Sequence, residues 1–315
     1  MVALRHMPPP EFFEAEEKSL IVGPERKRLW AVLLDLLVEF GRVCEKHSIP
    51  WSIDGGTMLG ARRHGGFIPW DDDIDVIMLR SEYERLKEIA PREFQYPYFL
   101  QNNDTDPECI RGHAQFRNSA TTAILKAEWD GSQALYHFNQ GVFIDVFVLD
   151  NVPDNECERA SFFSELAELK RKMLEARRRL SYRFRMEDLR SLRGFYDLGC
   201  HFFWRFRQWI AGGDLLHALG ARLDLLAQKY NSVECRDVSH LTYEPTPTEK
   251  VIFRRDKLKE LERVRFEGIE VPCLRESDYY LTHFYGDWHR HVVGGTCHGG
   301  MIIDVDKPYA EYLRK

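Results

Sequence analysis

Two aspartates inside an apolar stretch are the residues of this sequence best suited to chemistry. Asp73 and Asp75 lie two positions apart, with Ile74 between them and Val76 after them. In an extended segment such residues point to the same face, so the two carboxylates would be buried side by side. Their burial is unfavourable unless a positive charge lies between them. The pattern therefore predicts a divalent cation, and oxygen ligands favour Mg²⁺ or Mn²⁺.

A third aspartate, Asp145, occurs in a second apolar run, Phe-Ile-Asp-Val-Phe at 143–147. If the two runs pair as strands of one sheet, three carboxylates converge and a two-metal site becomes feasible. The alternative is that Asp145 faces solvent on an edge strand or pairs with an arginine. Asp71 is a weaker candidate ligand, because Asp71 to Asp73 also fit a solvated acidic turn. Asp150 is interpreted as a turn residue.

The segment before the aspartates has features of a phosphate site. Gly55 and Gly56 would let the backbone approach a phosphate closely, and Thr57 opens a short predicted helix whose free N–H groups attract anions. Arg62, Arg63 and His64 lie close enough in sequence for one or two of them to reach a pyrophosphate. Arg117, beside Ser119 and Thr122, is a second candidate for phosphate binding. The alternatives are that Arg63 is solvated, that His64 caps the helix, and that Arg117 pairs with a surface acid.

The elements that would position these residues follow from periodicity. Apolar residues at helical spacing predict a helix over 24–47, followed by strands at 51–53 and 73–79 with a short helix at 57–63 between them. Ser81 and Glu84 resemble a capping box that opens a helix closed by Pro91. Further strands are expected at 98–101, 110–116, 121–125 and 142–149, then helices over 154–230 and a hairpin within 264–271 around Gly268.

Composition favours a globular cytoplasmic protein that does not bind nucleic acid. The chain has 315 residues, 44% hydrophobic and 30% charged, with a net charge of −6 that gives no general attraction to nucleic acid. Its seven cysteines are scattered along the chain, which indicates reduced thiols and not a disulfide framework. We see no signal-peptide pattern and no run long enough to span a bilayer.

The segment 159–193 combines a local excess of Lys and Arg with apolar residues at helical spacing. A basic amphipathic helix of this kind can lie on an anionic membrane, which predicts peripheral contact with the inner face of the membrane. The alternative is an ordinary solvated face. The aromatic run at 201–210 suits an interface or a core equally well.

Two long motifs resemble the LicD family, which includes bacterial phosphocholine transferases and fukutin-related proteins. They are GGTMLGARRHGGFIPWDDDIDVIM and GVFIDVFVLD, and the resemblance extends to RNSATT at 117–122 and to FEGIEVP followed by DYYLTHFYGDW. The chain departs from the family pattern at Val148, where a proline is usual, and at GGTCHGG after YGDW.

The resemblance implies an α+β fold with a nucleotidyltransferase-like mixed sheet, flanking helices and a helical insertion. Three regions are expected: a core over 1–153, a basic helical region over 154–240 and a C-terminal α/β part over 241–315. Asp73, Asp75 and Asp145 would be the catalytic metal ligands. Gly55, Gly56, Thr57, Arg62, His64 and Arg117 would bind the donor.

The implied reaction moves phosphocholine or a related phosphoalcohol from a CDP-alcohol, with CDP-choline expected as the donor. The acceptor would be a sugar hydroxyl of a lipopolysaccharide or teichoic acid precursor, which can be lipid-linked. Two alternatives stay open: transfer of the nucleotidyl group itself, and a silent binding protein.

Aromatic residues near the motifs could form a choline cage or belong to an ordinary core. They are Trp51, Trp70, Trp129, Tyr136, Phe138, Tyr285 and Trp288. His289, His291, Cys297 and His298 have residue types that bind zinc, but their spacing matches no standard zinc site, so polar surface or substrate contact is favoured.

Overall fold

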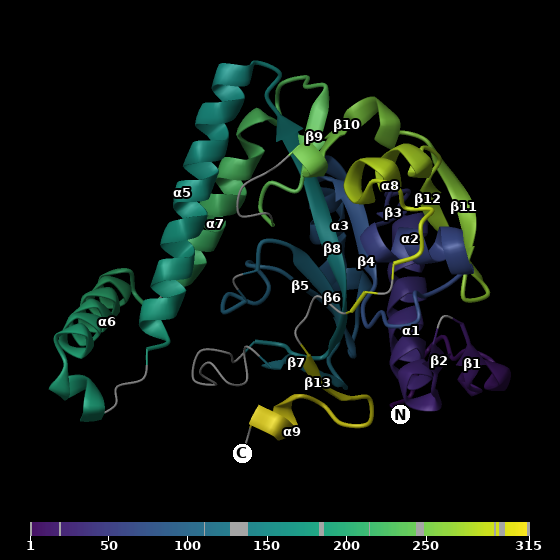
Figure 1. Ribbon diagram of the computed structural model, residues 1–315, viewed down its shortest axis with the longest axis horizontal. Helices are drawn as coiled ribbons and strands as arrows, with labels where there is room; N and C mark the ends of the chain where they lie inside the picture. The colour runs from purple at the N-terminus through teal and green to yellow at the C-terminus, as the bar shows by residue number, and fades with distance from the viewer. Residues whose placement is uncertain are drawn as a thin grey trace.

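In the computed structural model, a mixed β-sheet forms the centre of the molecule (Figure 1). The structure describes residues 2–18, 20–109, 111–126, 138–182, 186–213, 215–243, 249–292, 294–295 and 300–313. In this part of the chain the main sheet has seven strands: β3 (Ser52–Ile53), β4 (Asp75–Leu79), β5 (Tyr98–Gln101), β6 (Ala114–Asn118), β8 (Val142–Val152), β9 (Asp237–Ser239) and β10 (Ile252–Arg254). The mixed sheet confirms the expected α+β class.

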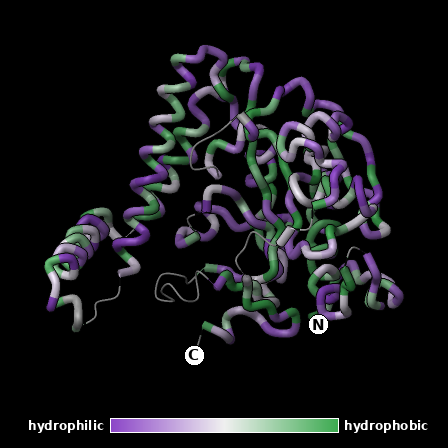
Figure 2. Tube along the Cα trace, viewed as in Figure 1, coloured by the Kyte–Doolittle hydropathy of each residue, from purple (hydrophilic) through white to green (hydrophobic). Residues whose placement is uncertain are grey.

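The strand β8 organises the sheet because it pairs along both edges. One edge runs parallel to β4, with Asp75 opposite Asp145. The other edge pairs antiparallel with β6 in its first half and with β9 in its second half. All eleven residues of β8 are buried, and the hydrophobic colouring continues along the central strands (Figure 2). A strand with neighbours on both edges has a fixed register, so its side chains are held firmly.

Helices cover the sheet. The helix α1 (Pro24–Lys46) starts with proline at its first position and packs on β6 and β8, as its apolar periodicity predicts. The short helix α2 (Gly55–His64) links β3 to the loop before β4. The helix α3 (Arg80–Glu93) follows β4 directly. Beside β3 lies the predicted hairpin, formed by β11 (Leu261–Phe266) and β12 (Ile269–Leu274), and α8 (Ser277–Tyr285) follows it.

In the described residues between β8 and β9, three α-helices form an insertion: α5 (Glu156–Leu180), α6 (Leu192–Ile210) and α7 (Leu215–Ala227). A small core joins α5 to α7 and contains Phe162, Leu166, Leu169 and Met173. The expected helical insertion is therefore present. The domain boundaries at 153 and 240 stay predictions.

The remaining elements are short. At the N-terminal side are a 3-10 turn (Pro10–Phe13), β1 (Glu16–Glu17) and β2 (Ile21–Val22). Near the C-terminus, β13 (Met301–Asp304) pairs with β7 (Thr122–Leu125), and α9 (Ala310–Leu313) follows β13. Within the described part of the chain, none of the helices combines the length and the apolar character needed to cross a bilayer.

Several sequence expectations need correction. Asp73 precedes β4 rather than lying in it, and α3 continues through Pro91 without a capping contact from Ser81. Asp150 is not a turn residue, because β8 continues to Val152 and buries it completely. The basic amphipathic helix expected over 159–193 is also only partly correct, since α5 ends at Leu180 and its apolar face is covered by the protein.

Candidate active site

Three aspartates converge where β4 begins. Asp75 is the first residue of β4 and lies opposite Asp145 of β8, while Asp73 comes from the loop just before. A hydrogen bond of 2.8 Å from the Asp145 N–H to the Ile74 carbonyl joins the loop to β8. One carboxylate oxygen of each aspartate lies within 4.8 Å of the others. The structure thus confirms that the two apolar runs pair as strands and bring the three carboxylates together.

The start of α2 is packed against the same carboxylates. Gly55 has φ of +48°, and a Cβ there would lie 3.0 Å from Asp75 Oδ2. A Cβ on Gly56 would lie 3.0 Å from Asp71 Oδ2. Thr57 is buried and its hydroxyl oxygen accepts a 2.9 Å hydrogen bond from the Asp75 N–H. The two glycines therefore let the carboxylates approach the helix backbone, and Thr57 fixes the start of β4.

Asp71 and Asp72 extend the acidic cluster through Asp73. The loop that carries them is held by its backbone, since the Asp71 carbonyl accepts hydrogen bonds from Trp30 Nε1 at 3.0 Å and from Arg26 at 2.9 Å. Burial and the nearby carboxylates of Asp73 and Asp72 raise the pKa of Asp71 well above its ordinary value. This arrangement contradicts a solvated acidic turn.

The electrostatics of the cluster fit a bound cation. Burial raises the pKa of Asp75 well above its ordinary value, and the charges of Asp73, Asp145, Asp54 and Asp71 raise it further. Asp54 is also buried, and its Oδ1 has no hydrogen-bond partner among the described residues. Several carboxylates held together without a counter-charge are costly, and a divalent ion would neutralise them. Oxygen donors alone suit Mg²⁺ or Mn²⁺.

Asp145 is oriented by two side chains, one from β6 and one from the loop that precedes β6. His113 Nε2 lies 2.9 Å from Asp145 Oδ1, and Gln115 Nε2 donates to the same oxygen at 2.6 Å. Burial raises the pKa of Asp145, but the contacts with His113 and Gln115 outweigh it and leave the pKa below its ordinary value. Sequence reasoning missed both residues, because only the β6–β8 pairing brings them to Asp145.

Arg117 lies elsewhere than a phosphate contact would require. It is fully buried, and its guanidinium donates to the side-chain oxygens of Gln101 and Gln115 and to the Gly141 carbonyl. The contact with Gln115 connects Arg117 to Asp145 through one intervening side chain. The structure thus encloses Arg117 within the protein and does not place it among the donor-facing groups.

The other basic candidates contact groups other than the three carboxylates. Arg62 forms an ion pair with Glu262 on β11, and Arg63 donates to the Arg290 carbonyl at 2.8 Å. His64 lies near His291, with ring centroids 6.0 Å apart, and burial lowers its pKa. None of these contacts joins the three basic residues to the aspartates.

Two further polar side chains lie near Asp54 and Gly55. His240 Nε2 lies 3.8 Å from Asp54 Oδ2, and burial lowers the pKa of His240. Tyr285 is close to Gly55, and burial beside Asp75 raises its pKa. Asp54 immediately precedes Gly55, so its position could have drawn attention in the sequence. His240 follows β9 and gave no comparable signal.

The aromatic residues considered for a choline cage lie in different environments. Trp51 and Phe138 are buried in apolar clusters. Tyr285 lies close to Gly55, which packs against Asp75. Trp70 directly precedes Asp71 in the chain. The Trp288 side chain donates to Asp278 at 3.2 Å. Trp129 and Tyr136 lie outside the described residues, as do Cys297 and His298 of the possible zinc cluster.

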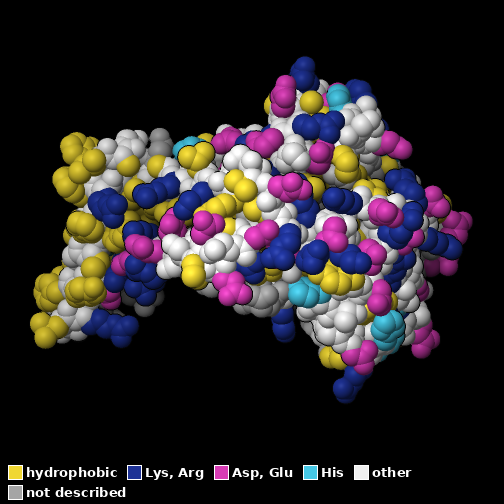
Figure 3. Space-filling view, turned by 90° about the horizontal axis from the view of Figure 1, so that it is seen from above, with side chains coloured by type: hydrophobic (Ala, Val, Ile, Leu, Met, Phe, Trp, Pro, Cys, Tyr) yellow, Lys and Arg dark blue, Asp and Glu magenta, His cyan; other side chains and the backbone are white. Residues whose placement is uncertain are grey.

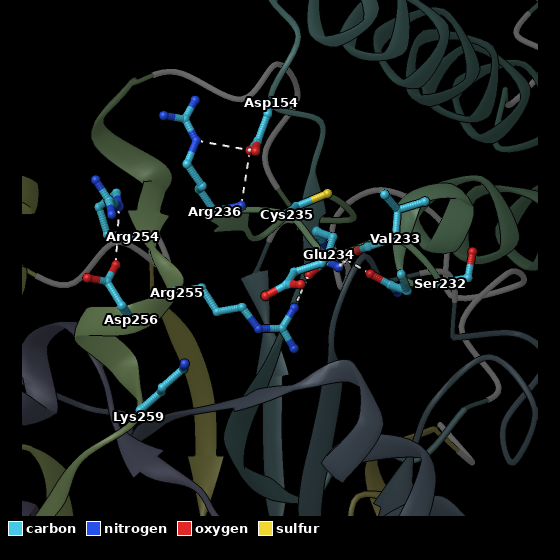
Figure 4. Close-up of a pocket in the computed structure, with 12 residues that line it drawn as sticks. Asp154, Ser232, Val233, Glu234, Cys235, Arg236, Arg254, Arg255, Asp256 and Lys259 are labelled. Atoms are coloured by element: carbon cyan, nitrogen blue, oxygen red, sulfur yellow. Dashed lines mark hydrogen bonds and ion pairs between the residues drawn. The ribbon is translucent and has the colours of Figure 1, made fainter.

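A polar pocket of about 790 Å³ lies at the opposite end of β8 (Figure 4). Asn151 in its lining is six residues beyond Asp145, or about 20 Å along the strand. Arg236 pairs with Asp154 there, and Arg254 pairs with Asp256. The described residues of its lining include no convergent ligand set like the three aspartates, so the carboxylate cluster is the better candidate for chemistry.

A second pocket, of about 320 Å³, includes in its lining His113, the residue that contacts Asp145. Its lining also includes Arg111 and residues of α7. The positive charge of Arg111 contributes to the lowered pKa of Asp145. Arg111 is therefore a cation near the site that sequence reasoning overlooked.

Comparisons with known proteins agree with this site. Residues 48–165 match the family model described as LicD/FKTN/FKRP, nucleotidyltransferase domain. The chain is 27% identical over 82% of its length to the lipopolysaccharide cholinephosphotransferase LicD of Haemophilus influenzae, with 88% of that protein covered. It is also 34% identical over 71 residues to an uncharacterized protein of Rickettsia typhi, covering 22% of this chain and 23% of that protein. The matched family segment contains all three converging aspartates.

Proposed function

We propose that this chain transfers a phosphoalcohol to a glycan, because residues 48–165 match the model of the LicD/FKTN/FKRP nucleotidyltransferase family. The phosphoalcohol would be phosphocholine, taken from CDP-choline, because the relative from Haemophilus influenzae is named a cholinephosphotransferase. The acceptor would be a sugar hydroxyl of a cell-surface glycan precursor. Lipopolysaccharide is favoured over teichoic acid by that same name.

The observation that carries the proposal is the convergence of Asp73, Asp75 and Asp145. Three largely buried carboxylates with oxygens within 4.8 Å of one another are unsuited to a purely structural role. It suits the binding of a metal ion together with a phosphate-bearing substrate.

Asp73, Asp75 and Asp145 would hold Mg²⁺ or Mn²⁺, with Asp71 as a further candidate ligand. When bound, such an ion neutralises pyrophosphate charge and stabilises the charge that develops during phosphoryl transfer. Gln115 and His113 would hold Asp145 in the orientation that ligation requires, as groups behind metal ligands commonly do.

In the proposed step, a sugar hydroxyl oxygen forms a bond to the phosphorus that carries choline. The bond from that phosphorus to the bridging oxygen breaks, and CMP leaves with the bridging oxygen. A carboxylate of the cluster accepts the hydroxyl proton. Catalysis would rest chiefly on positioning the two substrates and on electrostatic stabilisation.

The donor phosphates would bind at the start of α2, where the backbone at Gly55 and Gly56 is accessible at close range. We propose Arg111 as the cation near the donor phosphates. Arg117 is not proposed for this role, because its guanidinium donates hydrogen bonds to protein oxygens. Arg62 and His64 would have to leave their present contacts to reach a phosphate. Tyr285 and Trp70 are the aromatic candidates for the choline group.

The deciding experiment is a titration of CDP-choline into the protein with Mg²⁺, combined with a CMP-release assay on glycan acceptors. We expect metal-dependent binding that Asp75→Asn abolishes. Asp256→Asn is the matched control, because Asp256 is exposed and pairs with Arg254 away from the carboxylate cluster. CDP-ethanolamine, CDP-glycerol and CDP-ribitol in parallel would identify the alcohol. Failure of every CDP-alcohol to bind would overturn the proposal.

Nucleotidyl transfer is the second candidate, because the family model describes a nucleotidyltransferase domain. The same carboxylates would then act on ATP or CTP. Release of pyrophosphate instead of CMP would establish this alternative, and absence of turnover with either class of donor would favour a silent binding protein. We also propose that the protein works in the cytoplasm, where CDP-alcohols are made available.

A further inference from the structure

The helix α6 carries a broad apolar face that the protein does not cover. Its exposed hydrophobic side chains are Leu192, Phe195, Tyr196, Phe202, Phe203, Phe206, Trp209 and Ile210. Leu192 is 92% exposed and Trp209 is 75% exposed. At about 100° per residue these positions fall on one side of the helix. A continuous face of this size on one exposed helix indicates an interaction surface.

The opposite side of α6 anchors it to the rest of the protein. Trp204 packs in a small core with Leu180 of α5 and Leu215 of α7. Asp197 forms a 2.6 Å ion pair with Arg179, and His201 Nδ1 lies 2.7 Å from the Arg179 carbonyl. These contacts hold α6 in a defined orientation with its apolar face turned outward.

The position of α6 makes this face accessible. The helix lies beyond the end of α5 that is remote from the sheet (Figure 1). In the view from above, hydrophobic side chains gather at this end of the molecule with Lys and Arg side chains beside them (Figure 3). The surface therefore lies apart from the carboxylate cluster.

Charges along α6 have one predominant sign. Arg193, Arg205 and Arg207 are exposed, and by helical angle Arg205 borders one edge of the apolar face while the other two border the opposite edge. The acidic residue of the helix, Asp197, is engaged by Arg179 on the inner side. Basic edges along an aromatic and aliphatic face complement the headgroups and acyl chains of an anionic bilayer.

We propose that α6 docks on an anionic phospholipid membrane, lying in the plane of the interface with its apolar face inserted by about 5–10 Å. Trp209 and Tyr196 suit the headgroup level, where amphipathic rings are favoured. We therefore assign the membrane contact to α6 and not to the segment 159–193, because the apolar residues of α5 are buried against α7. This assignment does not depend on the proposed reaction, although a lipid-linked acceptor would give it a purpose.

The test is co-sedimentation of the full chain with large phosphatidylcholine vesicles that contain or lack phosphatidylglycerol. We expect binding that requires phosphatidylglycerol and weakens with salt. The triple variant Phe202→Ser/Phe206→Ser/Trp209→Ser should bind at least about 10-fold more weakly, since it removes the largest inserted side chains. Arg193→Gln/Arg205→Gln should lose most of the phosphatidylglycerol dependence.

The matched control is Leu225→Ser, which removes a 74% exposed apolar side chain of α7 outside the surface. It should leave vesicle binding unchanged, and circular dichroism should show all variants folded. CMP release with a soluble sugar acceptor should persist in the triple variant, which separates this inference from the proposed function. Absence of binding to anionic vesicles would overturn the inference, as would a chain that forms dimers through α6 by light scattering without binding vesicles.

Discussion

Asp75 and Asp145 lie directly opposite each other on the parallel strands β4 and β8. Neighbouring strands are about 4.8 Å apart, so two carboxylates at matched positions repel each other when no cation is present. Because Gly55 packs closely against Asp75, that side chain has little room to move away. The sheet itself therefore creates the need for a counter-charge.

The first prediction concerns stability without metal. Asp75→Asn should leave the metal-free melting temperature unchanged or raise it, because the substitution removes like-charge repulsion in a buried cluster. The wild type should gain melting temperature with added Mg²⁺ or Mn²⁺, and the variant should not. Differential scanning calorimetry with and without the ions measures both effects. A variant that gains as much as the wild type would exclude Asp75 as a ligand.

The second prediction separates backbone strain from site geometry. Gly55 and Gly65 have positive φ, at +48° and +64°, so alanine at either position should cost about 1 kcal/mol of folding free energy. Only Gly55→Ala brings a methyl group against Asp75, because a Cβ at Gly65 would meet nothing within 4 Å. We expect loss of metal binding and turnover in Gly55→Ala alone. Equal activity in the two variants would refute the role of the close approach.

The third prediction concerns the support of Asp145. Gln115→Leu should lower Mn²⁺ affinity or turnover by about 10- to 100-fold, because Asp145 loses a 2.6 Å hydrogen bond. Arg117→Met should act in the same direction, since it frees Gln115 to rotate. Calorimetric titration of Mn²⁺ provides the measurement. Full metal affinity in a merely destabilised Gln115→Leu would show a structural role only.

The fourth prediction tests a buried ion pair outside the site. Arg80 donates two 2.8 Å hydrogen bonds to Asp150, which is fully buried. Asp150→Asn should destabilise the fold by about 3 kcal/mol, because it leaves a buried guanidinium without its main partner. Asp224 also contacts Arg80 at 2.9 Å but is 38% exposed, so Asp224→Asn should cost much less. Urea unfolding of both variants compares them, and equal losses would contradict the dominance of Asp150.

The fifth prediction is a pH dependence of stability. Burial raises the pKa of Glu39, but hydrogen bonds and charges from Arg42, His6 and Arg5 outweigh it and lower the pKa below 4.5. A lowered folded-state pKa stabilises the protein above the unfolded value, and the contribution disappears as pH falls through the folded value. The stability difference between wild type and Glu39→Gln should therefore shrink below about pH 4.5. A difference independent of pH would contradict this assignment.

Sequence periodicity predicted the elements that carry the acidic cluster because their signals are local. The helix expected over 24–47 is α1, and the runs containing Asp75 and Asp145 are strands that pair as expected. Errors appear where a local signal competes with packing. Pro91 was expected to close a helix that continues for two more residues, and Asp150 appeared to be a turn residue although Arg80 stabilises it inside a strand.

By itself, the sequence determined the residue types and spacings that suit a metal and a phosphate, and the motifs that resemble the LicD family. The tertiary structure decided which side chains lie where a metal or a phosphate could bind. Pairing of β6 with β8 brought His113 and Gln115 to Asp145 and enclosed Arg117 among protein oxygens. Packing of α5 on α7 buried one amphipathic face and left that of α6 exposed. These outcomes depend on contacts between residues far apart in the chain, which no local pattern specifies.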